Sequence, residues 1–345
     1  MTGVARVTLA RNLAIAAAAG VGLWVLTSTV SAYANVQIAT MAYYFVAVAG
    51  LTVLTGQNGQ VSLGHGALMA VGAYATAKIG EAVTWPLAAV LAAAALLTAI
   101  AGLLVGAAAA RLRGPYLAGA TLALAVGLPA LATRFSDFLG ASNGLTVAPP
   151  IPPASLGATF PLERWQAWIA CAGALIAYVL LANLMRSGYG RAFRAVRDDE
   201  IAAQLAGYHV ARTQVVAFVV SAACAGLAGG LLAVVTSVAA PGAFTLTLSV
   251  ALLTGVILGG LGSLAGAVWG AAALVLLPSW SDDLSGALSL SSNVQANLAL
   301  AFYGLVLIAV ILVAPHGLQG ALGKAIGRMW DQRRRGRAPR KEEEE

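Results

Sequence analysis

Residues 186–212 read RSGYGRAFRAVRDDEIAAQLAGYHVAR and form the one long charged segment in the middle of an otherwise apolar chain. Five arginines and three acids lie in this segment, and no lysine or arginine follows between Thr213 and Gly323. Ionised side chains and unpaired backbone groups are costly in hydrocarbon. We therefore expect residues 186–212 to be a loop at one face of a membrane.

A short helix is predicted inside this loop. The acids at 198–200 suit the start of a helix, residues 201–206 favour its continuation, and Gly207 is a suitable stop. Such a helix has about two turns and a length of roughly 10 Å. One face of it carries the apolar residues Ile201, Ala202 and Leu205. This patch suits a groove on another protein, although spacing alone is equally compatible with an ordinary solvated loop.

Composition indicates an all-α polytopic membrane protein. The chain has 345 residues, of which 60% are hydrophobic and 10% charged. Each span needs ~20 apolar residues, and several such runs follow one another. The formal net charge of +7 lies at the ends of these runs and in the tail, as the positive-inside rule predicts, which argues against a nucleic-acid partner. Cys171 and Cys224 lie in apolar runs and predict neither a disulfide nor a metal site.

About ten membrane crossings are expected, including broken or re-entrant helices. The apolar runs are 13–31, 36–54, one ending near Ala77, 86–110, one following Arg113, 165–185, 213–238, 244–278 and 297–314, with a polar loop beginning at Ser279, Ser281, Asp282 and Asp283. Residues 244–278 must cross twice, with a hinge near Gly262. The first run is expected to be a retained span, and a signal peptide cleaved after residues 32–34 is the alternative.

The distribution of basic residues predicts the orientation. If both termini, the turn at Arg111 and Arg113 and the central loop are cytoplasmic, all but three of the 20 basic residues lie inside. The proline-rich connection 134–164 is then extracytoplasmic, where it is either a docking surface or a loose linker. Residues 321–345 form a basic cytoplasmic tail that is expected near anionic lipid.

Two glycine-rich interruptions are candidates for breaks in membrane helices. TGQNGQVSLGHG at 55–66 and GGLGSLAG at 259–266 are polar or small segments within apolar surroundings. A short turn between spans is the alternative for the first. The strings that begin with LTG at 54–75 and 253–273 are alike, which indicates an internal repeat or a chance similarity of small residues. His65 is expected to be a packed histidine rather than a proton relay.

Several motifs resemble one family. Glu200, Ala202, Ala203 and Gly207 resemble the coupling segment of ABC-transporter permeases, a short cytoplasmic helix that docks onto an ATPase subunit. The wider run at 186–207 is similar to that of the branched-chain amino acid permeases of the LivM type. TGQNGQVSLGHGALMAVGAYA at 55–75, RLRGPYLAGATLALAVGLPALATRFSDFLGASNGLTV at 111–147 and APHGL at 314–318 resemble the same family, over roughly residues 35–320.

The resemblance implies a single transmembrane permease domain at 1–320 in the bacterial inner membrane. Its partners would be membrane lipid, a LivH-type second permease, two ABC ATPase subunits and an extracytoplasmic substrate-binding protein. Its cargo would be leucine, isoleucine and valine, moved by ATP-driven alternating access. Urea, short amides or other amino acids are alternative cargoes. An ion-coupled secondary transporter and a scaffold or signalling protein are alternatives of other classes.

No enzymatic motif is present. The chain has no HExxH or GxSxG, and the segment ending at Lys324 departs from the phosphate-loop pattern, so ATP and Mg²⁺ are expected on partner subunits and no cofactor in this chain. No acid lies within the predicted spans, which weighs against proton coupling. The residues expected to couple to the ATPase are Arg194, Asp198, Glu200, Ile201, Ala202, Ala203, Leu205 and Gly207. The residues expected along the translocation pathway are Gly56, Gln57, Asn58, Gly59, Gln60, Ser62, Gly64, His65, Thr121, Asn143, Gly259, Gly260, Gly262 and Ser263.

Overall fold

A computed structural model describes residues 2–110, 115–157 and 159–287, together with 304, 305, 308, 309, 312 and 317–322. Arg111, Arg113, most of the run 297–314 and the tail from 323 lie outside the described residues. The helices are α1 (Thr2–Thr29), α2 (Ala32–Leu51), η1 (Thr52–Gln57), α3 (His65–Ala82), α4 (Leu87–Ala109), α5 (Pro115–Arg134), α6 (Ser136–Leu139), η2 (Ala141–Asn143), η3 (Ala154–Leu156), α7 (Leu162–Arg186), α8 (Gly188–Asp198), α9 (Glu200–Leu205), α10 (Val210–Thr236), η4 (Pro241–Ala243), α11 (Leu246–Gly259) and α12 (Leu264–Ala287). Two short strands, β1 (Leu145–Thr146) and β2 (Val238–Ala239), complete the described fold.

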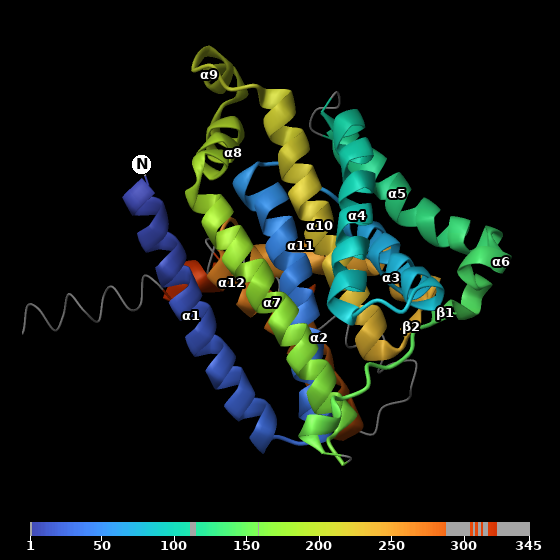
Figure 1. The fold of residues 1–345 in the computed structure, drawn as a ribbon. Helices are drawn as coiled ribbons and strands as arrows, with labels where there is room; N and C mark the ends of the chain where they lie inside the picture. The colour runs from blue at the N-terminus through green and yellow to red at the C-terminus, as the bar shows by residue number, and fades with distance from the viewer. Residues whose placement is uncertain are drawn as a thin grey trace, which may run out of the picture.

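Seven helical segments of the described chain are long and apolar enough to cross a membrane (Figure 1). They are Thr8–Thr29, Ala32–Gln57, Leu87–Ala109, Tyr116–Arg134, Leu162–Arg186, Val210–Thr236 and Pro241–Gly259. Helix α3 packs inside the same bundle, and α12 contributes a shorter apolar segment, Leu264–Trp280. The predicted class, an all-helical polytopic membrane protein, is confirmed.

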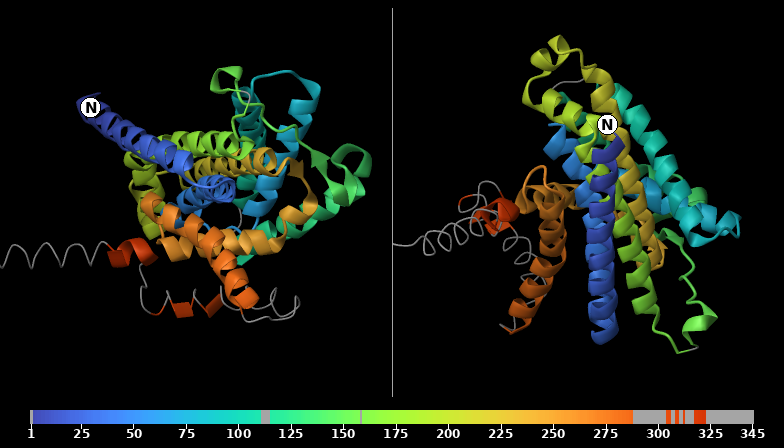
Figure 2. Two further views of the ribbon diagram at one scale, coloured as in Figure 1. Left: turned by 90° about the horizontal axis from the view of Figure 1, so that it is seen from below. Right: turned by 60° about the vertical axis from the view of Figure 1, so that its left-hand side comes forward.

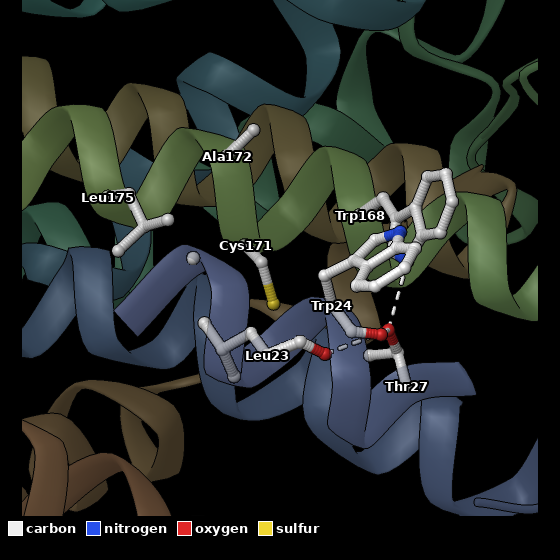
Figure 3. Close-up of a pocket in the computed structure, with 8 residues that line it drawn as sticks. Leu23, Trp24, Thr27, Trp168, Cys171, Ala172 and Leu175 are labelled. Carbon is white, nitrogen blue, oxygen red and sulfur yellow. Dashed lines mark hydrogen bonds between the residues drawn. The ribbon is translucent and has the colours of Figure 1, made fainter. Parts of the chain in front are cut away.

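Helices α1 and α7 run antiparallel and define the two ends of the bundle. Near the start of α1, the Asn12 amide donates to Asn183 Oδ1 over 2.9 Å. Near its end, Trp168 Nε1 donates to Thr27 Oγ1 over 2.9 Å (Figure 3). The amino-terminal part of α1 therefore lies beside the end of α7, where the chain continues into α8 and α9. Figures 1 and 2 show α9 projecting from this end of the bundle.

Helix α10 forms the centre of the bundle and packs against α2, α3 and α4. Small residues permit the close approach, because a Cβ added to Gly72 of α3 would overlap the backbone of Gly226 in α10. Likewise, a Cβ at Gly229 would overlap the backbone of Met69. Membrane helices gain van der Waals contact in this way where lipid provides no hydrophobic driving force between helices.

The proline-rich connection is shorter than predicted. Helix α7 begins at Leu162, so Arg164 belongs to this helix, and its guanidinium donates to the carbonyls of Thr27 (3.0 Å) and Ser28 (2.6 Å) at the end of α1. The connection is also tied to the bundle by pairing of β1 with β2, in which Leu145 lies opposite Ala239. It is therefore not a loose linker along its whole length.

The predicted polar loop at Ser279 is wrong. Helix α12 continues to Ala287 and includes Pro278 and both Asp282 and Asp283. The change from apolar to polar residues at this point marks the end of the hydrocarbon-compatible part of the helix, Leu264–Trp280, rather than the end of the helix. The two acids consequently lie within a helix, but beyond its apolar segment.

Candidate functional site

The first predicted break is confirmed, and it begins with a π-helix. Helix α2 ends at Leu51, the chain continues as η1 through Gln57, and α3 begins at His65, so the helical run extends beyond the predicted end at residue 54. After this wide turn the backbone hydrogen bonds no longer follow a helical pattern. The amide of Gln60, for example, donates to the carbonyl of Leu54 over 3.1 Å. Single π-helical turns of this kind frequently mark functional sites in helices.

Hydroxyl groups from two other helices stabilise the break. Thr121 Oγ1 of α5 accepts a hydrogen bond from the amide of Leu63 over 3.0 Å. Ser249 Oγ of α11 accepts one from the amide of Gly66, also over 3.0 Å. Backbone groups that a broken helix leaves unpaired must find partners within the protein or in a wet cavity. The predicted pathway residue Thr121 thus lies at the break, and Ser249 is a residue of this site that sequence reasoning missed.

The break contains polar side chains that are buried but not fully paired. Asn58, Gln60, Ser62 and His65 are all buried. Both amide atoms of Asn58 and Oε1 of Gln60 have no hydrogen-bond partner in the described structure. Neither ring nitrogen of His65 makes a well-formed hydrogen bond, although the ring interacts with the backbone of Ala47 in α2. Unpaired buried polar groups are costly, so a pathway that brings water or a polar solute to them would stabilise them.

The second break lies directly against the first. Helix α11 ends at Gly259 and α12 begins at Leu264, and between them Gly260 (φ +116°) and Gly262 (φ +85°) adopt backbone conformations that L side chains rarely adopt. The hinge predicted near Gly262 is therefore confirmed. The side-chain amide of Gln57 donates to the carbonyl of Gly262 over 2.6 Å, and a Cβ added to Gly56 would overlap the backbone of Gly262.

A third glycine-containing segment meets the same point. Gly317 has φ +74° and is buried, and a Cβ at this position would overlap the backbone of Gly260. Close by in sequence, Gln319 Oε1 accepts a hydrogen bond from Trp269 Nε1 of α12 over 3.1 Å. Three segments that are far apart in the sequence therefore converge at the breaks, and each contributes a glycine.

The predicted short helix in the charged loop is confirmed as α9. Asp199 Oδ1 caps its start by accepting from the amides of Ile201 (2.8 Å) and Ala202 (3.0 Å). At its end, Gly207 adopts φ +85°, and the amide of Tyr208 donates to the carbonyl of Ala203 over 3.0 Å. The paired bond from the amide of Gly207 to the carbonyl of Gln204 completes a Schellman motif, which ends the helix sharply.

One face of α9 is open and the other is anchored. The side chains of Ile201 and Leu205 are 72% and 86% exposed. Ala203, in contrast, is buried in a small cluster with Val196 of α8 and Val210 of α10. Ala203 therefore anchors α9 to the bundle instead of lying on its open face, and its predicted part in ATPase coupling stays a prediction. It faces inward because residues two apart on a helix point in different directions.

Two arginines of α8 connect this projecting end to the breaks. Arg197 Nη1 donates to the carbonyl of Gly56 over 2.8 Å. Arg194 Nη1 donates to Gln57 Oε1 over 3.1 Å and to the carbonyl of Met185 over 3.2 Å. Arg197 also pairs with Asp198 at 2.7 Å. Sequence reasoning missed α8 as a helix and Arg197 as a site residue; two arginines three apart, with the apolar Val196 between them, were the available signal.

Asn143 lies on a different element from the other predicted pathway residues. It lies exposed in η2, next to the segment that carries β1. Strand β1 pairs with β2, which follows the end of α10, whereas α9 precedes the start of that helix. Because α10 has 27 residues and is roughly 40 Å long, Asn143 lies near the other end of α10 from α9. The expectation that it lines the pathway stays a prediction.

The two described cavities lie elsewhere. A groove of about 700 Å³ between α4 and α7 is lined by apolar residues such as Leu91, Ile169 and Ile176. A smaller cavity of about 130 Å³ lies between α1 and α7 and is lined by Leu23, Cys171 and neighbouring side chains (Figure 3). Neither lining includes a predicted pathway residue among the described side chains. Apolar grooves between outer helices of this kind suit the packing of lipid chains rather than a polar solute.

The bundle, its two adjoining breaks and its buried neutral polar groups define a multi-pass helical membrane protein built like a transport protein. Residues 32–311 match the family described as "branched-chain amino acid transport system / permease component", and the chain belongs to this family.

Two relatives share the printed name "High-affinity branched-chain amino acid transport system permease protein LivM". The protein of Salmonella typhimurium strain LT2 is 31% identical over 266 residues, which is 70% of this chain and 62% of the relative. That of Escherichia coli K12 is 32% identical over 253 residues, covering 66% of this chain and 59% of the relative. The matched part thus spans about three fifths of the length of each relative. No solved structure matches the chain.

Proposed function

We propose that the chain is the permease subunit of a binding-protein-dependent ABC importer that carries branched-chain amino acids across the bacterial cytoplasmic membrane. The family membership and the two LivM relatives support this role. The observation that carries the mechanism is the projecting helix α9, which is connected through α8 to the buried breaks. An importer permease needs such a connection because its energy is supplied outside the membrane.

In this proposal, Ile201 and Leu205 enter a groove on an ABC ATPase subunit. Their exposure leaves an apolar face at the projecting end, while the Asp199 cap and the Gly207 stop hold the helix in shape. Glu200 further ties α9 to α10, because its Oε1 accepts from Gln214 over 2.9 Å. The complete importer would contain a LivH-type second permease, two ATPase subunits and an extracytoplasmic binding protein.

The proposed topology has ten crossings and both termini in the cytoplasm. The placement of the start of α1 beside the end of α7, from which the chain continues into α8 and α9, supports a common side for the amino terminus and α9. Helices α11 and α12, joined at Gly260–Ser263, would supply the two crossings proposed for residues 244–278. The final crossing falls on residues 297–314, most of which lie outside the described part.

The proposed mechanism is alternating access. ATP-driven closure of the ATPase pair displaces α9, and the breaks change their packing so that the bundle opens toward the other side. The neutral amides and hydroxyls at the break, among them Asn58, Gln60 and Ser62, present hydrogen-bonding groups to a polar solute without a fixed charge. ATP and Mg²⁺ bind to the partner subunits, and this chain performs no bond chemistry.

Uptake of labelled leucine tests the cargo. Cells that lack the gene should lose leucine uptake, and uptake in the parent should be competed by isoleucine and valine. Unchanged leucine uptake together with lost uptake of urea or acetamide would retain the importer and reject its proposed cargo. Unchanged uptake of all of these, with no ATPase subunit co-purifying with the tagged chain, would reject the proposed function itself.

A charge on α9 tests the docking face. Ile201→Asp should prevent the ATPase subunits from co-purifying with the permease, because an ionised carboxylate is costly to bury in an apolar groove. Ile151→Asp is the matched control: Ile151 is 88% exposed, but lies in the connection before α7 at the opposite end. This control should leave assembly unchanged. Normal assembly and uptake with Ile201→Asp would contradict the docking role.

A further inference from the structure

We propose that Arg194 and Arg197 are positioning residues that transmit the displacement of α9 to the two helix breaks, an inference that rests on the proposed coupling function. Helix α9 follows α8 with only Asp199 between them, so a movement of α9 is passed directly to α8. From α8, each arginine reaches a different group of η1: the carbonyl of Gly56 or the side chain of Gln57.

The connection continues from η1 into the second break. The side chain of Gln57 accepts from Arg194 through Oε1 and donates to Gly262 through Nε2, so one amide bridges α8 and the α11–α12 hinge. Gly56 lies against the backbone of Gly262 with no room for a Cβ. A displacement of η1 must therefore also displace residue 262, since neither contact has space to absorb it.

The first break also packs tightly against α8 itself. Gly59 has φ +78°, and a Cβ at this position would lie 2.9 Å from Cγ of Arg197. The adjoining face of α8 is fixed by Phe193, which is fully buried, and by Val196. Helix α8 is thus held between the projecting helix and the breaks, and its arginines provide the polar contacts on the break side.

The test uses the full complex in vesicles, with partner permease, ATPase subunits and binding protein. A cysteine is introduced by Val61→Cys, because Val61 lies in the break and is 44% exposed, whereas the native Cys171 and Cys224 are buried. The rate of its modification by a polar maleimide is measured with and without ATP. In the otherwise unchanged protein the two rates should differ, and this readout does not depend on the identity of the cargo.

Adding Arg194→Ala and Arg197→Ala together should abolish the ATP dependence of this rate. Uptake should fall on the order of tenfold or more, the scale expected for the loss of hydrogen bonds from a charged group. The ATPase subunits should still co-purify and hydrolyse ATP, because Ile201 and Leu205 are unchanged. Arg191→Ala, an exposed position on the same helix, is the matched control and should behave as the parent protein.

Three results would overturn the proposal. The first is a modification rate that still depends on ATP in the double arginine variant, and the second is loss of the ATPase subunits from a double-variant permease that folds normally. The third is an Arg191→Ala variant that loses the ATP dependence of the rate as the double variant does. If the double-variant permease itself does not fold and cannot be recovered from the membrane, Gln57→Glu decides, because it leaves α8 intact but cannot donate to the Gly262 carbonyl. This variant should also lose the ATP dependence, and normal behaviour would reject the bridge. Failure of leucine uptake in the parent complex would instead count against the proposed function.

Discussion

Gly207 illustrates how one residue determines the shape of the proposed docking helix. Its φ of +85° is in the left-handed region, where an L side chain costs roughly 1–2 kcal/mol, and a Cβ there would meet no other atom within 4 Å. Gly207→Ala should therefore weaken the end of α9 through backbone strain alone. Gly207→Asn should do so less, since asparagine tolerates this region better.

Hydrogen exchange of the amides of residues 201–208 measures this effect. We expect faster exchange in the alanine variant than in the asparagine variant. Equal protection in both variants and in the parent protein would show that the Schellman motif does not hold α9.

Two glycines of α3 form a matched pair for the packing of the bundle. Gly72 faces the backbone of Gly226, whereas a Cβ added to Gly80 would have no other atom within 4 Å. In a helix, alanine is favoured over glycine by about 1 kcal/mol, so Gly80→Ala should be neutral or stabilising. Gly72→Ala should instead destabilise by about 1–3 kcal/mol through overpacking against an unyielding backbone.

Thermal unfolding of the purified protein in detergent compares the two variants. The Gly72→Ala protein should unfold at a lower temperature than the parent, and the Gly80→Ala protein should not. A similar change in both would mean that helix propensity, and not the contact between α3 and α10, determines the result.

At the scale of elements, α1 is tied to α7 at both ends by polar contacts. Asn12 bonds to Asn183, and the last turn of α1 supplies acceptors to Arg164 and Trp168. Removal of α1 would leave these α7 groups without their partners in an apolar environment, which is costly. We therefore predict that the first helix is retained as a span and is not a cleaved signal peptide.

The intact mass of the protein purified from membranes checks this prediction. The mass should include residues 2–29. A mass that corresponds to cleavage after residues 32–34 would contradict it. As a control, Asn183→Ala should leave the mass unchanged while making α1 more accessible to added protease.

The elements also show which parts of the fold could be predicted from the apolar runs of the sequence. Seven predicted spans coincide with described helices that are long and apolar enough to cross a membrane, because an apolar run of membrane length must be a helix whose backbone bonds are internal. The end of α12 was missed because polarity marks the membrane boundary and carries no signal for the end of a helix. Helix α8 was missed because its buried positions, such as Phe193, are few and lie among arginines.

At the scale of the whole molecule, the proposed topology places α9 and both termini on one side. Reporter fusions test it: an enzyme active only outside the cytoplasm should be active after residue 157, in the connection before α7, and inactive after residue 208 or at the carboxyl terminus. Activity at the carboxyl terminus would contradict the ten-crossing arrangement. The exposed conformation of Ala154–Leu156 makes this connection suitable for an insertion.

The amino-acid sequence by itself determined the class of the protein, the positions of most spans, both breaks and the short helix from Glu200 to Leu205. These features follow from local properties: hydrophobic length, charge, glycine content and capping residues. Only the tertiary structure revealed that the two breaks touch through Gly56 and Gly262, that Arg194 and Arg197 reach the first break from α8, and that the strand following Asn143 pairs with β2 after the end of α10. Contacts between residues well over a hundred positions apart depend on how the helices pack, and no local pattern in a single sequence encodes that packing.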